Sequence, residues 1–230
     1  FFVTTILDQA VAGCGALPDM DGVDTGGDLW TPKAQMANIE MNELLYPIMY
    51  LQRKENADTG GIGKFRGGVA FCSALISWDT PAKELNCLVK GMGTEPRESG
   101  GFSGGYPGAN TLGQLVRNAD VLEKLKRGKM VKDIRQITGD KKTLPSVCTF
   151  TLGEKDVLLL YEGNGGGYGD PIDRDPELVL KDVINGYVSH DLASEAYGIV
   201  IDSKKFQVDS KKTKERRKEI VEERLKVGRR

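Results

Sequence analysis

Two basic side chains lie in a glycine-rich stretch whose composition suits the binding of an anion. Lys64 and Arg66 occur in GGIGKFRGG, among five glycines. Backbone N–H groups exposed by glycine, together with a positive side chain, form concavities that bind anions. The same composition is also typical of a solvated hairpin. The sequence therefore leaves two interpretations open for Lys64 and Arg66, namely contact with an anion and a hairpin without a ligand.

An earlier stretch, LPDMDGVDTGGDLW, combines glycines with four aspartates. These are Asp19, Asp21, Asp24 and Asp28. Their spacing does not match an EF-hand loop, which needs a bidentate glutamate at its twelfth position. One interpretation is a long loop built from Asx turns. The other is a loop at the mouth of an active site.

The densest glycine run is YEGNGGGYGDP, in which five of the seven residues from 163 to 169 are glycine. It follows an apolar run but lacks the G-x-G-x-x-G spacing, and Pro171 with the IDRD stretch separates it from the next predicted helix. Both features argue against a dinucleotide site of the Rossmann type. The stretch GGFSGGYPGANT likewise lacks the spacing of a Walker phosphate loop. We expect YEGNGGGYGDP to be a tight turn whose backbone closely approaches protein or substrate.

The remaining reactive residue types define no catalytic motif. His190 is the only histidine and is expected at the surface, in the first turn of a helix. The four cysteines are far apart in the sequence, which argues against a zinc knuckle and favours free thiols in a cytoplasmic protein. There is no G-x-S-x-G nucleophile motif, and no pair of carboxylates is singled out as acid and base. Local motifs assign neither a metal site nor catalytic residues in this chain.

Composition excludes two classes of partner. The net charge is −1, so the chain as a whole is not suited to gripping nucleic acid. No apolar run reaches the roughly 18–20 residues that span a bilayer. The chain opens with the apolar FFVTTILDQAVAGCGA and no methionine. We therefore expect it to be the C-terminal part of a longer polypeptide, with other protein covering this opening.

Hydrophobic patterns predict strands first and helices later. Strands are expected at 46–51, 69–78, 84–92, 148–152 and 157–161, with a brief one at 199–201. Pro47 suggests an edge or a strand start, and 84–92 is the expected hairpin or meander partner of 69–78. Residues 114–137 are ambiguous.

Three helices are predicted in the last third of the chain. The first covers 176–186, with Asp175 as N-cap, Pro176 at the first position and Gly186 as the C-terminal stop. The second covers 189–197 and the third starts near residue 211. The predicted fold class is mixed α+β, with short strands and glycine-rich loops followed by C-terminal helices. We expect a strand- and loop-rich region at 1–160 and a glycine turn plus helices at 161–230, as one continuous domain of a longer subunit.

Taken in order, six segments resemble the C-terminal half of the hydantoinase B family. They are DGVDTGG, NELLYP, DTGGIGKFRGG, GGYPGANT, GNGGGYGDPIDRDPELVLKDVINGYVS and YGIVID. The family includes subunits of N-methylhydantoinases, of oxoprolinases, and of ATP-dependent acetone and acetophenone carboxylases. The resemblance runs from about Gly22 to about Val208, and the block from Gly165 to Val188 is its most specific part.

The resemblance implies a hetero-oligomeric enzyme acting on a small carbonyl substrate. ATP and Mg would bind a hydantoinase A-type ATPase subunit, which phosphorylates a carbonyl or enol oxygen. Metal ligands (Zn, Mn or Fe), where present in the family, lie in the N-terminal half of the hydantoinase B-type subunit. That half is a further expected partner, and no metal ligand is carried onto this chain. A closed, dry site would protect the reactive phosphate from water.

Three functions follow from this resemblance. The first is part of a biotin-independent ketone carboxylase acting through a phosphorylated enol. The second is ATP-dependent hydrolysis of a hydantoin, oxoproline or lactam ring, and the third is a non-catalytic assembly module. For the first two, the candidate contacts to substrate or intermediate are Asp24, Thr25, Gly26, Gly27, Lys64, Arg66 and Asp170. Charge-assisted contact with an anionic intermediate motivates Lys64 and Arg66.

Overall fold

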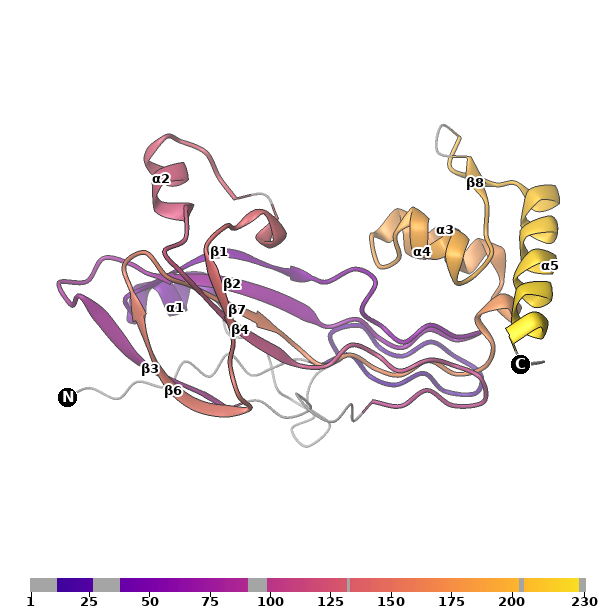
Figure 1. Ribbon diagram of the computed structural model, residues 1–230, viewed down its shortest axis with the longest axis horizontal. Helices are drawn as coiled ribbons and strands as arrows, with labels where there is room; N and C mark the ends of the chain where they lie inside the picture. Colours follow the sequence, from indigo (N-terminus) through magenta and orange to yellow (C-terminus); the bar gives the residue numbers. More distant parts are fainter. Residues whose placement is uncertain (1–11, 27–37, 91–98, 132, 203–204, 228–230) are drawn as a thin grey trace.

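The computed structural model describes residues 12–26, 38–90, 99–131, 133–202 and 205–227 (Figure 1). Gly27, Asp28 and residues 1–11 of the apolar opening lie outside this part of the chain. The described strands are β1 (Ile48–Glu55), β2 (Phe71–Ser77), β3 (Glu84–Lys90), β4 (Leu112–Arg117), β5 (Asp140–Thr143), β6 (Val147–Gly153), β7 (Val157–Tyr161), β8 (Ile201–Asp202) and β9 (Gln207–Val208). The helices are α1 (Ile39–Leu45), α2 (Val121–Lys126), α3 (Pro176–Asn185), α4 (His190–Glu195) and α5 (Ser210–Val227), with short 3₁₀ turns η1 (Ile134–Gln136) and η2 (Pro171–Asp173). The predicted mixed α+β class is confirmed.

The main sheet is antiparallel and has the strand order β1-β2-β7-β4-β5. β1 lies at one edge and follows Pro47 directly, as the proline indicated. The prediction that 84–92 pairs with 69–78 was wrong, because β3 pairs with β6 in a separate two-stranded sheet. The segment forms a strand where expected, but the period of two that reveals a strand carries no information about its partner.

Both faces of the main sheet are covered, which explains why every residue of β2 is buried. On one face, Ala74 and Ile76 pack in a cluster with Val121 of α2 and Ile134 of η1. On the other face, Leu75 packs in a cluster with Leu152 of β6 and side chains of β3. The β3–β6 ribbon is therefore a second layer rather than an extension of the sheet, and residues 114–137 supply β4 and the cover of the first face.

The C-terminal helices follow the predicted end signals closely. The Asp175 carboxylate accepts a hydrogen bond from Glu177 N, and Gly186 ends α3 in the left-handed conformation with φ of 79°. Ser189 caps α4 through Leu192 N. The helices share a small core in which Val179 and Tyr197 are fully buried. The brief strand predicted at 199–201 lies further on, at Ile201–Asp202, and α5 begins one residue before its predicted start.

Glycine-rich stretches continue from the main sheet towards the C-terminal helices. Figure 1 shows them as long, wavy segments that run side by side. We call them the glycine bundle, which consists of residues 12–17, 21–25, 59–63, 65–69, 101–109 and 163–169. These residues have almost no helix or strand assignment. Backbone hydrogen bonds between segments replace the internal bonds of regular structure.

Residues 163–169 lie at the centre of the glycine bundle. The N–H groups of 164 and 167 donate to the segment 101–109, at 3.0 and 2.9 Å. Those of 165 and 168 donate to 65–69, at 3.1 and 3.0 Å, while the carbonyls of 163 and 166 accept from 12–17, at 3.0 and 2.9 Å. Each neighbour is thus met at every third residue. That period is the one of an extended helix of the polyproline II type, which has three residues per turn and no internal hydrogen bonds.

Glycine is required in this centre because the neighbouring backbones leave no room for a side chain. A Cβ atom built on Gly165 would lie 1.8 Å from Cys14 O, and one on Gly166 would lie 1.9 Å from Gly100 O. Neither glycine adopts a left-handed conformation, so space rather than backbone freedom selects it. The expectation that YEGNGGGYGDP is a tight turn was wrong. The expected close approach of its backbone does occur, and the surface approached is the chain's own backbone.

Candidate functional site

Arg66 and Asp24 meet in a buried ion pair at the inner side of the glycine bundle. The two terminal nitrogens of Arg66 donate to the two carboxylate oxygens of Asp24, at 2.8 and 3.0 Å. Nη1 also donates to Gly67 O at 2.7 Å, and the guanidinium lies 5.0 Å from the Tyr187 ring centroid. The Asp24 carboxylate accepts a further bond from Val69 N at 2.8 Å. Arg66 is only 3% exposed and the Asp24 side chain is 20% exposed, so water reaches this pair only from the side of the aspartate.

A second arginine, Arg174, extends the pair into a network. Its Nη1 and Nη2 donate to the two carboxylate oxygens of Asp21, at 2.6 and 2.7 Å. Nη2 also donates to Asp182 at 2.7 Å, and Nη1 donates to Lys64 O at 3.0 Å. The other oxygen of Asp182 lies 3.5 Å from Arg66 Nε. The five residues Asp21, Asp24, Arg66, Arg174 and Asp182 are called the arginine network below.

The arginine network joins parts of the chain that are distant in sequence. Asp21 and Asp24 belong to the aspartate-rich loop, whereas Arg174 precedes α3 and Asp182 lies within it. Arg217 of α5 adds a third layer, because its Nη2 donates to Arg174 O. The sequence interpretation missed Arg174 and Asp182. An available signal was that Asp182 stands three residues after Val179, on the apolar side of a helix, where a carboxylate requires a buried cation.

The electrostatics of the network differ between its carboxylates. Burial disfavours ionisation of Asp21, but the hydrogen bonds and charge of Arg174 and the N–H of Arg66 outweigh burial and lower its pKa. For Asp182, burial dominates and raises the pKa even though both arginines oppose that effect. The side chain of Asp182 is 9% exposed and that of Asp21 is 29% exposed, which accounts for the difference. The pKa of Arg174 is raised because its carboxylate partners outweigh desolvation.

The other predicted contacts occupy three separate environments. Thr25 has a φ of 47° and its hydroxyl donates to Glu55 at 2.6 Å. A Cβ atom on Gly26 would meet Cys14 Sγ at 2.6 Å, so this glycine is selected by space. Asp170 caps η2 through Ile172 N and forms a two-oxygen ion pair with Arg224 of α5, at 2.9 and 2.8 Å. Gly27 lies outside the described residues.

Lys64 is the exposed cation of the set. Its backbone N–H donates to Gly169 O at 3.1 Å, which places it beside Asp170, and its ammonium group lies 5.6 Å from the Phe65 ring centroid. The side chains of Arg66 and Asp24 thus bond to each other, whereas Lys64 lies beside Asp170, outside the arginine network. The guanidinium of Arg66 is already occupied by carboxylates. The prediction that Lys64 or Arg66 contacts an anionic intermediate stays a prediction, and Lys64 is the one whose charged group is accessible.

Other features of the described residues bear on the remaining expectations from the sequence. No group of three or more His, Cys, Asp or Glu side chains in the described ranges is arranged to hold a metal ion. The four cysteines are free thiols, as expected, and His190 is exposed. None of the helices that the structure describes has the length and apolarity to cross a bilayer. The two principal hollows lie elsewhere, around Trp78, and the predicted contacts line neither.

Comparison with known proteins gives consistent matches along the chain. A sequence model described as hydantoinase B/oxoprolinase matches residues 2–171. The acetone carboxylase alpha subunit of Xanthobacter autotrophicus is 31% identical over 94% of this chain and 30% of its own length. The caprolactamase subunit beta of Pseudomonas jessenii is 33% identical over 87% of this chain and 32% of its own length.

A solved structure agrees with these matches. The nucleotide-free structure of acetone carboxylase, from work on ATP-dependent acetone carboxylation, aligns with a TM-score of 0.79 at 30% identity. The alignment covers 95% of this chain and 30% of that chain. This chain therefore spans about a third of the length of the relatives that it matches.

Proposed function

Because the chain belongs to the hydantoinase B/oxoprolinase family, we propose that it forms part of the hydantoinase B-type subunit of an ATP-dependent multi-subunit enzyme. The observation that carries the proposal is the family match, which covers 170 of the 230 residues by its bounds of 2 and 171. Both named relatives are subunits of larger enzymes. The expected partners are a hydantoinase A-type subunit that binds ATP and Mg, and the remaining portion of a hydantoinase B-type subunit.

Carboxylation of a ketone is the reaction that the comparisons support best. The match to the acetone carboxylase alpha subunit covers more of this chain than the match to the caprolactamase subunit, 94% against 87%. In this reaction, phosphorylation would trap the ketone as its enol phosphate. The enol carbon would then form the new bond to bicarbonate-derived CO₂ while the P–O bond breaks, so that the oxygen remains as the ketone of the product and phosphate is released to water. ATP-dependent lactam hydrolysis is the second candidate, since the caprolactamase subunit has the higher identity, 33%.

The geometry supports a positioning role for this chain in that reaction. The arginine network and the glycine bundle hold their own groups in closed contacts, so their contribution is a rigid surface. A rigid support is what precise placement of reacting groups requires. Any metal of the complex would belong to the remaining portion of the subunit. Thr25, Lys64 and Asp170 are the proposed points of contact with substrate or intermediate, with Asp24, Gly26 and Arg66 behind them.

The test uses the purified complex that contains this chain. ATP hydrolysis would be measured with a panel of ketones, hydantoins and lactams, with and without labelled bicarbonate. Label in an acid-stable product with a ketone would establish carboxylation. ATP-dependent ring opening without uptake of label would establish hydrolysis and overturn the first choice. Assembly without any ATP-dependent turnover would favour a non-catalytic module.

Lys64 provides a residue-level prediction for this function. Lys64→Ala removes an exposed charge that has no role in the arginine network, so the melting temperature should change by less than about 2 °C. Turnover by the complex should fall at least about tenfold if the ammonium group binds an anionic intermediate. Lys129→Ala, at another exposed lysine, is the matched control. Unchanged turnover in Lys64→Ala would remove this residue from the site.

A further inference from the structure

Helix α1 exposes large apolar side chains and buries a polar one, which is the opposite of the usual arrangement. Its only buried residue is Asn42, whose Nδ2 donates to the Tyr50 hydroxyl at 3.1 Å. Its large apolar side chains face outwards, with Met41 52%, Leu44 78% and Leu45 62% exposed. A helix on a soluble domain normally buries its apolar stripe. Within the described residues, this face of α1 is therefore left without cover.

The exposed face is held in place by specific contacts. The Asn38 side chain caps the helix through Met41 N at 3.1 Å. The Glu43 carboxylate accepts a bond from Tyr50 N at 2.7 Å, which fastens the helix to β1. Trp78 N donates to Pro47 O at 2.9 Å, so the end of β2 is fixed beside the helix. The apolar side chains thus form a preorganised surface, which lowers the entropic cost of binding.

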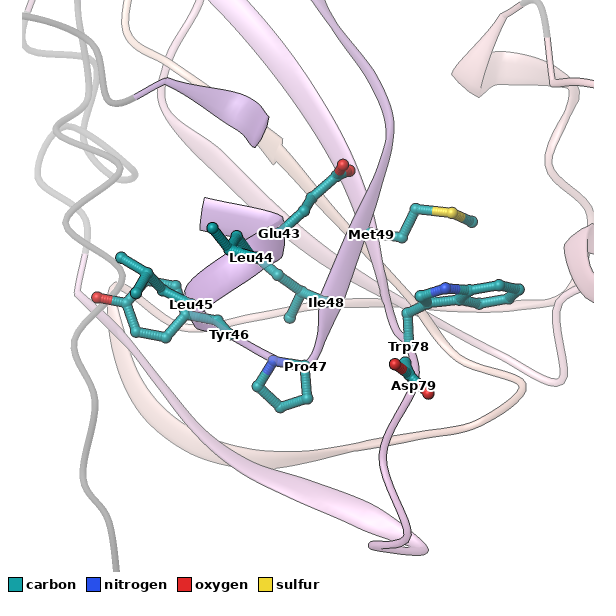
Figure 2. A pocket seen from close by; sticks show the side chains of 9 residues that line it. All are labelled: Glu43, Leu44, Leu45, Tyr46, Pro47, Ile48, Met49, Trp78 and Asp79. Carbon is teal, nitrogen blue, oxygen red and sulfur yellow. The ribbon is translucent and has the colours of Figure 1, made fainter. Parts of the chain in front are cut away.

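Trp78 stands between two open hollows beside α1. One, of about 460 Å³, is lined by residues 43–49, Trp78 and Asp79 (Figure 2). The other, of about 680 Å³, is lined by 77–83, Leu122 and Glu154. Figure 2 shows Leu44 and Leu45 on one side of the first hollow and the Trp78 indole on the other. A tryptophan that is 46% exposed between two hollows has the character of an interface anchor.

We propose that one surface of this chain is the docking site for the part of a hydantoinase B-type subunit that has no counterpart in this chain. This α1–Trp78 surface consists of Met41, Leu44, Leu45 and Trp78. The inference rests on the proposed function. The relatives are about three times as long as the region that they share with this chain, so in them this region is joined to a large body of further protein, which is the occupant that we propose. Exposed apolar side chains grouped around a hollow on a fixed scaffold are the kind of surface expected for such packing.

Charge narrows the chemistry of the docked segment. The carboxylates of Glu43, Asp79 and Glu154 line the two hollows, against the single ammonium group of Lys83. The segment should therefore combine apolar side chains with at least one lysine or arginine. A second copy of this chain fits less well, because a twofold interface would set the same acidic rim against itself.

Photocrosslinking in the assembled complex tests the site. Benzoylphenylalanine would replace Leu44, and the crosslinked peptide would be identified by mass spectrometry. The expected peptide belongs to the part of a hydantoinase B-type subunit that has no counterpart in this chain, and it contains a basic residue next to apolar ones. This holds whether the segment is continuous with this chain or carried by a separate polypeptide. Crosslinks within this chain or to a second copy of it would overturn the proposal, and so would the absence of any crosslink.

Substitutions give an independent measure where the two parts are separate polypeptides. Leu44→Asp and Trp78→Ala should each raise the Kd at least tenfold, which corresponds to about 1.4 kcal/mol. Leu88→Asp is the matched control, because Leu88 is 66% exposed on β3 and lines neither hollow, and its substitution should leave the Kd unchanged. The melting temperature of this chain alone should not fall in either test variant. A fall would show that the chain covers the surface itself, and an unchanged Kd would show that nothing docks there.

The inference and the proposed function fail in different ways. The expected crosslink in a complex without ATP-dependent turnover would keep the interface and overturn the function. Turnover without that crosslink would keep the function and overturn the interface.

Discussion

Arg174 shows how one side chain can hold several elements together. It contacts the aspartate-rich loop through Asp21, α3 through Asp182, and the backbone of Lys64 in the glycine bundle. The planar guanidinium suits these bidentate contacts, and a lysine ammonium cannot reproduce them. Because Arg174 is only 1% exposed, water cannot replace a lost partner. At this scale the network acts as a fastening between the glycine bundle and the helices.

Removing the Arg174 side chain should be costly for stability. Arg174→Ala leaves Asp21 and Asp182 without their main counter-charge, so we expect a loss of about 3–5 kcal/mol. For a chain of this length, the melting temperature should fall by at least about 6 °C. Arg135→Ala is the control, because Arg135 is 82% exposed in its pair with Asp133, and its loss should stay below about 1 kcal/mol. Equal effects of the two substitutions in thermal melts would contradict a structural role for the network.

The two pKa shifts predict opposite pH dependences. The pKa of Asp21 is lowered in the folded chain, so its stabilising contribution is present above the ordinary value near 3.8 and is lost as pH falls through the folded value. The gap in melting temperature between the wild type and Asp21→Asn should therefore narrow below about pH 4. The pKa of Asp182 is raised, so the folded state takes up a proton that Asp182→Asn cannot bind, and the melting temperature of the wild type should rise relative to that of Asp182→Asn as pH falls. Parallel curves from pH 7 to pH 3 would refute both assignments.

At the scale of elements, the glycine bundle depends on the absence of side chains. Every third residue of 163–168 meets the same neighbour, so a shift in one segment disturbs several others. The Asn164 side chain reinforces the centre, because its Oδ1 accepts bonds from Thr59 Oγ1 and Ala70 N, both at 2.7 Å. Backbone cannot move aside as a flexible side chain can. A single added carbon atom in this region is therefore enough to disturb the packing.

Two glycines at one contact give a matched test. Gly166→Ala places a methyl group 1.9 Å from Gly100 O, whereas a Cβ atom on Gly100 would have no neighbour within 4 Å. Gly166→Ala should lose about 3 kcal/mol or more, at the upper end for overpacking. Gly100→Ala should be close to neutral. Denaturant titration of both variants would measure this, and a Gly166→Ala variant as stable as the wild type would show that the backbones are not packed as described.

The sequence predicts elements whose signals are local. Asp175, Gly186 and Ser189 mark helix ends by their own chemistry, and all three do so in the structure. The strands 148–152 and 157–161 were predicted within one residue. The pairing of β3, the inverted helix α1 and the period-three contacts of the glycine bundle were not predicted, because they are decided by tertiary partners. For the site, the role of Arg66 and Asp24 as contacts to substrate stays a prediction, and their mutual pairing could not be read from positions 42 residues apart.

At the scale of the whole molecule, the two predicted regions share one interior. The central segment 163–168 belongs to the region 161–230, yet its hydrogen bonds reach 12–17, 65–69 and 101–109. The predicted division of the chain into two regions at residue 160 stays a prediction. Its companion statement, that the chain is one continuous domain of a longer subunit, likewise stays a prediction.

Truncation tests this continuity. A chain that ends at Glu162 keeps β7 but loses the centre of the glycine bundle and both Arg174 and Asp182. We expect it to show no cooperative thermal transition, because Arg66 would lose the Asp182 contact and the remaining glycine segments would lose their shared neighbour. Circular dichroism during heating measures this. A sigmoidal melt near that of the full chain would show that 1–160 folds independently.

The interior of the glycine bundle also has a thermal consequence. The contacts at its centre, between 163–168 and the neighbouring segments, are backbone hydrogen bonds, whereas the sheet packs apolar side chains on both faces. Exposure of apolar surface on unfolding raises the heat capacity, whereas exposure of polar surface lowers it. Opening the bundle should therefore contribute little or even negatively to the heat-capacity change, unlike opening the sheet. Because a small heat-capacity change flattens the stability curve, the bundle is the part of this molecule that cooling weakens least.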